Sequence, residues 1–177
     1  MLIKNIVKYL VLIKLTLLGS CVYAGTWEYT TKVDRMTSDV SKKAEIKSEN
    51  VFDYQDPLTG TTQVHLWVYE ATNGGASRVV GSTNALGIEC LEKRKICTVN
   101  VRFDDEKASL FAINIKHAIG GLFVISDAET IRFLAGARRA KTILMELRTP
   151  DAGRQVIEFT AEKPLVWQVT SGSAKTN

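Results

Sequence analysis

The side chains of this chain that could bind a metal, form a disulfide or act in catalysis include three cysteines and two histidines. Cys90 and Cys97 lie close together in one segment. A structural zinc site needs four ligands and thiol redox chemistry commonly uses a Cys-x-x-Cys spacing, and the sequence has neither pattern. In an oxidising compartment two neighbouring cysteines usually pair. The spacing therefore predicts a structural disulfide between Cys90 and Cys97, with no metal site and no cofactor.

The residues that follow Cys97 alternate apolar with polar side chains, which predicts a half-buried strand from about Cys97 to Phe103. We expect residues 87–89 to lead into its antiparallel partner, so that the two cysteines face each other. Closing so short a loop restricts the unfolded chain by only about 2–3 kcal/mol. The disulfide is thus expected to fix strand register more than overall stability.

Between the cysteines lies a basic group, Lys93, Arg94 and Lys95. Charged residues at the tip of a hairpin are usually solvated, and we expect a solvated turn here. The alternative is that these three side chains contact an acidic partner protein.

The histidines do not form a recognisable catalytic set with neighbouring residues. His65 lies in an alternating segment, residues 64–69, and is expected to be a sheet-face residue, whereas His117 is expected in a loop. Sequence spacing alone does not bring either close to a nucleophile or a carboxylate. We therefore predict a non-enzymatic protein, and a hydrolase that uses His65 or His117 is the alternative.

Residues 1–24 have the order of a secretory signal peptide. Lysines near the start are followed by a short apolar stretch, and then by small residues that suit cleavage before Gly25. The segment Leu18-Gly19-Ser20-Cys21 also resembles a bacterial lipobox, which would make Cys21 a lipidated first residue. We expect the periplasm as the location, with a membrane-anchored lipoprotein as the alternative.

Removal of the signal peptide changes the electrostatic interpretation. The chain has 23 Lys and Arg against 19 Asp and Glu, and three of the lysines lie in residues 1–24. The exported domain is left with a net charge of +1, so the pI of about 9.0 does not indicate a nucleic-acid-binding protein. The expected partner is another envelope protein, and a membrane is expected as a partner only if Cys21 is lipidated.

Residues 25–170 are expected to form a single β-rich domain, followed by a loose tail at 171–177. Alternating patterns predict strands at 25–30, 64–69, 78–80, 97–103, 109–115, 121–125, 142–148, 156–159 and 165–167. Residues 34–56 are read as a polar connecting segment. The fold class is therefore mainly β (α+β), an antiparallel sheet or a β-sandwich with one helix in the C-terminal half.

That helix is expected to begin at residues 126–129, whose Ser-x-x-Glu pattern is typical of a capping box. An apolar stripe of Ile131, Leu134 and Ala135 would face the core. The basic group Arg138, Arg139 and Lys141 would then lie at the helix end, where cations interact favourably with the dipole.

Five landmarks follow one another along the chain: the Trp27-x-Tyr29 opening, Asp-Pro-Leu-Thr-Gly at 56–60, the cysteine pair running into 98–104, the helix around Phe133 and Leu134, and the late strand with Val156, Glu158 and Phe159. This order resembles a group of bacterial periplasmic proteins that includes the type VI secretion-associated VasI/TagO family. The resemblance implies a β-rich periplasmic accessory or binding domain and not an enzyme.

Taken together, the sequence predicts a non-enzymatic cell-envelope accessory or binding protein, with a component of a secretion system as the particular role. The alternative is a membrane-anchored lipoprotein that acts in conjugation or phage exclusion.

Overall fold

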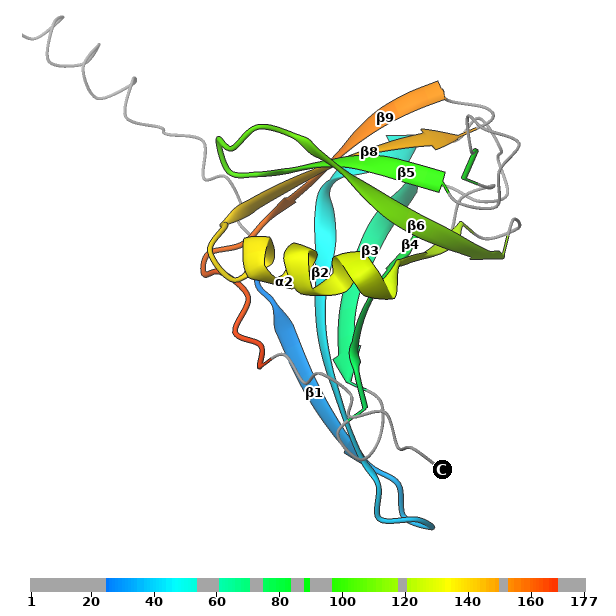
Figure 1. The fold of residues 1–177 in the computed structure, drawn as a ribbon, viewed down its shortest axis with the longest axis vertical. Helices are drawn as coiled ribbons and strands as arrows, with labels where there is room; N and C mark the ends of the chain where they lie inside the picture. The colour runs from blue at the N-terminus through cyan, green and yellow to red at the C-terminus, as the bar shows by residue number, and fades with distance from the viewer. Residues whose placement is uncertain are drawn as a thin grey trace, which may run out of the picture.

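The computed structural model describes residues 25–53, 61–70, 75–83, 88–89, 97–117, 121–149 and 153–168. These residues form one curled, antiparallel sheet with the strand order β1-β2-β3-β4-β7-β6-β5-β8-β9 (Figure 1). The strands are β1 (Glu28–Val33), β2 (Val40–Asp53), β3 (Thr61–Glu70), β4 (Ser77–Ser82), β5 (Cys97–Phe103), β6 (Ser109–His117), β7 (Leu122–Ile125), β8 (Thr142–Thr149) and β9 (Gly153–Thr160). The helix α2 (Asp127–Ala137) lies in the C-terminal half. The predicted fold class is confirmed, as an antiparallel sheet.

Helix α2 packs on the inner, concave side of the curled sheet. Phe133 of α2 meets Phe103 of β5 and Phe111 of β6, with ring centroids 5.4 and 5.7 Å apart and the planes nearly perpendicular. Edge-to-face pairs of this kind contribute about 0.5–1.5 kcal/mol beyond the burial of their area. The three rings therefore fix the helix at the centre of the core.

The predicted helix is present, but two of its details were wrong. Ser126 is the N-cap residue, yet its side chain makes no capping hydrogen bond, so the capping box is not formed. Ile131 is 59% exposed, and the buried face consists of Thr130, Phe133, Leu134, Gly136 and Ala137. A Cβ atom at Gly136 would lie 2.4 Å from the Phe103 ring. Because Gly136 has no side chain, this part of the helix can lie directly against Phe103. The face that packs on the sheet is therefore the one with Gly136, and not the predicted face with Ile131.

Strand β2 was missed because most of its residues are polar and no regular alternation of large apolar side chains marks it. The residues that face the core are Ala44, Ile46 and Ser48, while lysines and glutamates alternate with them on the outer face. Ala44 and Ser48 are small and carry little apolar signal. The segment interpreted as a connection is instead the longest described strand, and it pairs with both β1 and β3.

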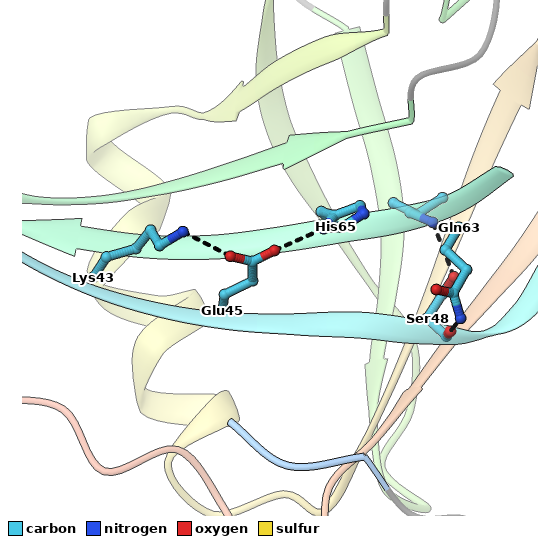
Figure 2. Close-up of polar contacts among 6 residues, drawn as sticks. Lys43, Glu45, Ser48, Gln63 and His65 are labelled. Carbon is cyan, nitrogen blue, oxygen red and sulfur yellow. Dashed lines mark hydrogen bonds and ion pairs between the residues drawn. The ribbon is translucent and has the colours of Figure 1, made fainter. Parts of the chain in front are cut away.

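A bulge interrupts β2 after Lys47. The pairing with β3 jumps from Lys47 opposite His65 to Val51 opposite Gln63. Ser48 holds this irregularity together, because its hydroxyl accepts a hydrogen bond from the Val64 N–H at 3.0 Å and donates one to the Asn50 carbonyl at 2.8 Å. The Gln63 amide group also donates to the Ser48 carbonyl, as Figure 2 shows. The otherwise lost ladder bonds are thus replaced by side-chain bonds.

The bulge directs two side chains toward the far end of the sheet. Asn50 donates to the Val156 carbonyl at 2.6 Å and accepts from the Glu158 N–H at 3.0 Å, and so pairs with the outer edge of β9 as a strand backbone would. Glu49 accepts from the Gly25 N–H at 3.2 Å. The Gly25 carbonyl in turn accepts from Glu162 at 3.0 Å, within an isolated parallel bridge between Gly25 and Ala161. These contacts hold β2 and Gly25 against β9 and the residues that follow it, and so close the curl.

Residues 164–168 do not form the predicted edge strand. They cross the inner side of the sheet, where Leu165 and Trp167 are buried and the Trp167 indole N–H donates to the Ser77 hydroxyl at 3.1 Å. The Val166 N–H donates to the Tyr29 hydroxyl at 2.9 Å. Trp27 is buried as expected, but Tyr29 is 51% exposed, so the expectation that both rings enter the core was wrong.

We predict that Asn50→Ala lowers the free energy of unfolding by about 1–2 kcal/mol, because two hydrogen bonds that join β2 to β9 are lost. Urea denaturation monitored by tryptophan fluorescence measures the change. Asn100→Ala is the matched control, since Asn100 is a partly buried residue of β5 whose side chain makes no hydrogen bond with the described residues. Equal stability of the Asn50 and Asn100 variants would show that the link to β9 contributes nothing.

Candidate functional site

The outer face of β2 and β3 carries a compact polar cluster. The Glu45 carboxylate accepts from Lys43 Nζ at 2.6 Å through one oxygen and contacts His65 Nδ1 at 2.7 Å through the other (Figure 2). Glu45 and Lys43 lie on β2, and His65 lies diagonally across from Glu45 on β3. The alternation of the strands therefore places all three side chains on one face.

Trp67 completes this cluster. Its ring centroid lies 6.0 Å from that of His65, and Lys43 Nζ lies 5.8 Å from the Trp67 ring centroid, within the range of a cation–π contact. The indole Nε1 is buried and has no hydrogen-bond partner among the described residues. Contacts from Lys43 and His65 thus fix the orientation of the ring on the sheet.

The pKa of Glu45 is controlled by opposing effects. Partial burial raises the pKa, but the hydrogen bonds from Lys43 and His65, with a smaller effect from Trp67, outweigh it and lower the pKa from 4.5 to about 2. An ionised carboxylate can only accept hydrogen bonds, so His65 Nδ1 must carry a proton and donate it. Glu45 is consequently a fixed anion that orients the imidazole and the lysine.

This arrangement fixes the positions of the His65 imidazole and the Lys43 ammonium group on the outer face of the sheet. Ser82 lies opposite His65 on β4, but its hydroxyl makes no hydrogen bond with His65 or with any other described residue. The histidine is therefore not paired with a serine nucleophile in this part of the chain. The cluster acts as a rigid support for the neighbouring ring of Trp67.

The sequence placed His65 correctly on a sheet face but gave no sign of its partner. The pair with Glu45 depends on the register of β2, a strand that the sequence did not predict. His117 is the last residue of β6 and not a loop residue. The only local signal for the cluster was the alternation of Lys43, Glu45 and Lys47, which by itself indicates a solvated face.

A second feature is the hairpin formed by β1 and β2. Pairing of β2 with β3 begins at Lys42, so the outer part of the hairpin has no neighbouring strand on that side and extends beyond the body (Figure 1). At its tip Met36 is 93% exposed, and Val33 and Val40, which pair across the two strands, are 61% and 44% exposed. We call this part of the structure, residues 28–42, the hairpin arm.

The turn at the tip is ordered by Asp34. Its carboxylate accepts from the Met36 N–H at 2.7 Å and the Thr37 N–H at 3.1 Å, and these two backbone bonds lower its pKa. The Asp34 carbonyl also accepts from the Ser38 N–H at 2.8 Å, and Ser38 adopts a positive φ of 60°. The exposed methionine is therefore presented on a defined turn.

The arm is hollowed at its base. A pocket of about 260 Å³ is lined by Tyr29, Thr30, Thr31, Lys42, Lys43, Glu70, Val166, Trp167 and Gln168. Within the described residues, no neighbouring strand pairs with the outer edge of β1. A strand that joined this edge would lie beside the pocket.

Most of the site residues predicted from the sequence lie outside the described residues. These are Cys21, Cys90, Lys93, Arg94 and Lys95. Cys97 is buried at the start of β5, opposite Ile113 of β6, and its pairing with Cys90 stays a prediction. The expectation that residues 87–89 lead into the partner strand of β5 was wrong for residues 88 and 89, which the structure describes. Strand β5 pairs with β6 and β8 instead, and the Glu89 N–H donates to the Arg148 carbonyl of β8.

Comparisons with protein-family models, with curated proteins and with solved structures each found no match. The resemblance to the VasI/TagO group thus depends on the sequence landmarks alone. Among the described residues, no helix combines the length and the apolar character needed to span a bilayer.

We predict that Glu45→Gln lowers the free energy of unfolding at pH 7 by about 1–2 kcal/mol, since charge-assisted bonds to Lys43 and His65 are weakened. Because the folded pKa is depressed, the contribution is complete above pH 4.5 and disappears as the pH falls toward about 2. The difference between wild type and variant should therefore shrink over this window in denaturation at a series of pH values.

Glu162→Gln is the control, because the exposed Glu162 side chain makes no ion pair with the described residues. A Glu45→Gln difference that stayed constant from pH 7 to pH 2 would contradict the assignment of Glu45 as the titrating group.

Proposed function

We propose that this chain is a non-enzymatic cell-envelope protein that binds another envelope protein through its hairpin arm, as an accessory component of a secretion system. The observation that carries the proposal is Met36, a large apolar side chain that is almost fully exposed on an ordered turn. Exposed apolar residues that lie together on a soluble domain commonly mark a protein interface. Methionine adapts well to irregular apolar surfaces.

The arm supports binding in two further ways. Val33 and Val40 extend the apolar surface along the side of the arm that carries Tyr29. The open edge of β1 supplies backbone donors and acceptors to an added strand, and the pocket at its base can receive a partner side chain. A partner with an extended segment and an apolar socket for Met36 would match these features.

The other edge strand of the sheet, β9, cannot accept an added strand at residues 156–158 in the same way. Asn50 occupies the backbone groups of Val156 and Glu158 on the outer edge of β9. Strand addition is thereby directed to β1. Because only the β1 edge is open, a single partner can add a strand there, whereas copies of this chain cannot associate edge to edge through both β1 and β9.

The environment of Gly25 supports export with cleavage before this residue. Its nitrogen lies 3.2 Å from a Glu49 carboxylate oxygen. In a chain that starts at Gly25 this nitrogen belongs to an α-ammonium group, and the hydrogen bond becomes an ion pair. Processing would then strengthen the contact that joins the N-terminus to the β2 bulge.

A photo-crosslinking residue at position 36 should form a discrete adduct with one envelope protein in cells, and the same residue at position 131 should not. Ile131 is the matched control because it is also exposed, at 59%, but lies on α2. Absence of an adduct at 36, or identical adducts at both positions, would contradict binding through the arm. Hydrolysis of peptidoglycan or lipid by the purified protein would contradict the non-enzymatic assignment.

The intact mass of the protein purified from envelopes tests its location. We expect a chain that begins at Gly25 and whose Cys90 and Cys97 are alkylated only after reduction. A chain that begins at Cys21 and carries acyl groups would instead support the lipoprotein in conjugation or phage exclusion. Alkylation of both cysteines without reductant would exclude the disulfide.

A further inference from the structure

A groove on the outer face of the sheet lies apart from the hairpin tip. It has a volume of about 400 Å³, which is within the range of small-molecule sites. Strands β3, β4, β6 and β7 and the first residue of α2 contribute its lining: Trp67, Tyr69, Arg78, Val80, Asn114, Lys116, Leu122, Val124 and Asp127. We propose that this groove binds an acidic sugar.

The floor of the groove is apolar and partly aromatic. Trp67 and Val80 are direct cross-strand partners on β3 and β4, and Val80 is in turn paired with Val124 of β7. Tyr69 lies next along the same face of β3. A sugar ring presents an apolar C–H face, which packs well on aromatic side chains, so the floor matches this part of the ligand.

The floor is held in place before any ligand arrives. Lys43 of β2 and His65, which precedes Trp67 on the same face of β3, both contact the Trp67 ring, and both are bonded to the Glu45 carboxylate. A ring that is already oriented loses little conformational entropy on binding. The polar cluster therefore supports this groove, and the partly buried Glu45 carboxylate has a structural role there.

Two cations lie at the groove. Arg78 and Lys116 are both exposed, and neither forms an ion pair with the described residues. They contrast with Arg132, Arg148 and Arg154, each of which is paired with a glutamate. Free cations at an apolar floor attract a carboxylate or phosphate on the ligand.

The remaining lining groups select a hydroxylated ligand. The Asn114 side chain offers both donors and an acceptor, and Asp127 offers acceptors for hydroxyl groups. Asp127 would also repel a polyanion, so a nucleic acid fits this groove poorly. A ligand with one acidic group, several hydroxyls and an apolar ring face satisfies all of these groups together.

Isothermal titration of the purified protein with the methyl glycoside of galacturonic acid tests the proposal, with the methyl ester of this glycoside and inorganic phosphate as comparison probes. We expect the galacturonic acid glycoside to bind and its uncharged ester to bind about tenfold more weakly. Arg78→Ala and Lys116→Ala should each weaken binding about tenfold, and added salt should weaken it further. Tyr69→Ala should weaken binding without loss of the fold, checked by circular dichroism.

Arg102→Ala is the matched control, since Arg102 is an exposed strand arginine on β5 that makes no ion pair with the described residues. Its affinity should equal that of the wild type. Absence of binding by the galacturonic acid glycoside would overturn the proposal, as would binding that Arg78→Ala and Lys116→Ala leave unchanged. Phosphate that binds as tightly as this glycoside would show that the aromatic floor is not used, and would overturn the assignment of a sugar.

Discussion

The structure depends on the bulge in β2 at residues 48–50. In an uninterrupted strand, side chains alternate regularly between the two faces of the sheet, and the backbone bonds only to the neighbouring strands. The irregularity instead lets Ser48 bond back to β3 while Glu49 and Asn50 reach Gly25 and β9. A single local departure from the ladder thereby connects both ends of the sheet, and the curl it stabilises encloses the core on which α2 packs.

The bulge also divides β2 into two parts with different roles. The bulge residues Glu49 and Asn50 take part in closing the sheet, while the residues before the bulge extend through the outer polar cluster into the hairpin arm. Glu45 lies in the part before the bulge and is fixed as an anion by Lys43 and His65. The closed body is therefore a rigid base from which the arm and the outer groove present their apolar and charged groups.

The sequence predicted the strands that alternate large apolar and polar residues, including β3 with Val64, Leu66 and Val68 buried. It missed β2, because small and polar side chains face the core there. The link from Asn50 to β9 joins residues separated by more than 100 positions, and no local pattern encodes such a contact. The Glu45 and His65 pair was missed for the same reason, since it depends on the register of that strand.

Native-state hydrogen exchange, followed by NMR, tests the role of the bulge most directly. The Glu158 N–H is bonded to the Asn50 side chain, and the Val64 N–H to the Ser48 hydroxyl. If the bulge holds the closed sheet together, both amides should exchange only through global unfolding, with the same free energy as the core amides of β5 and β8. Exchange of the Glu158 amide at a much lower free energy would show that β9 separates from β2 while the fold persists, and would contradict the account.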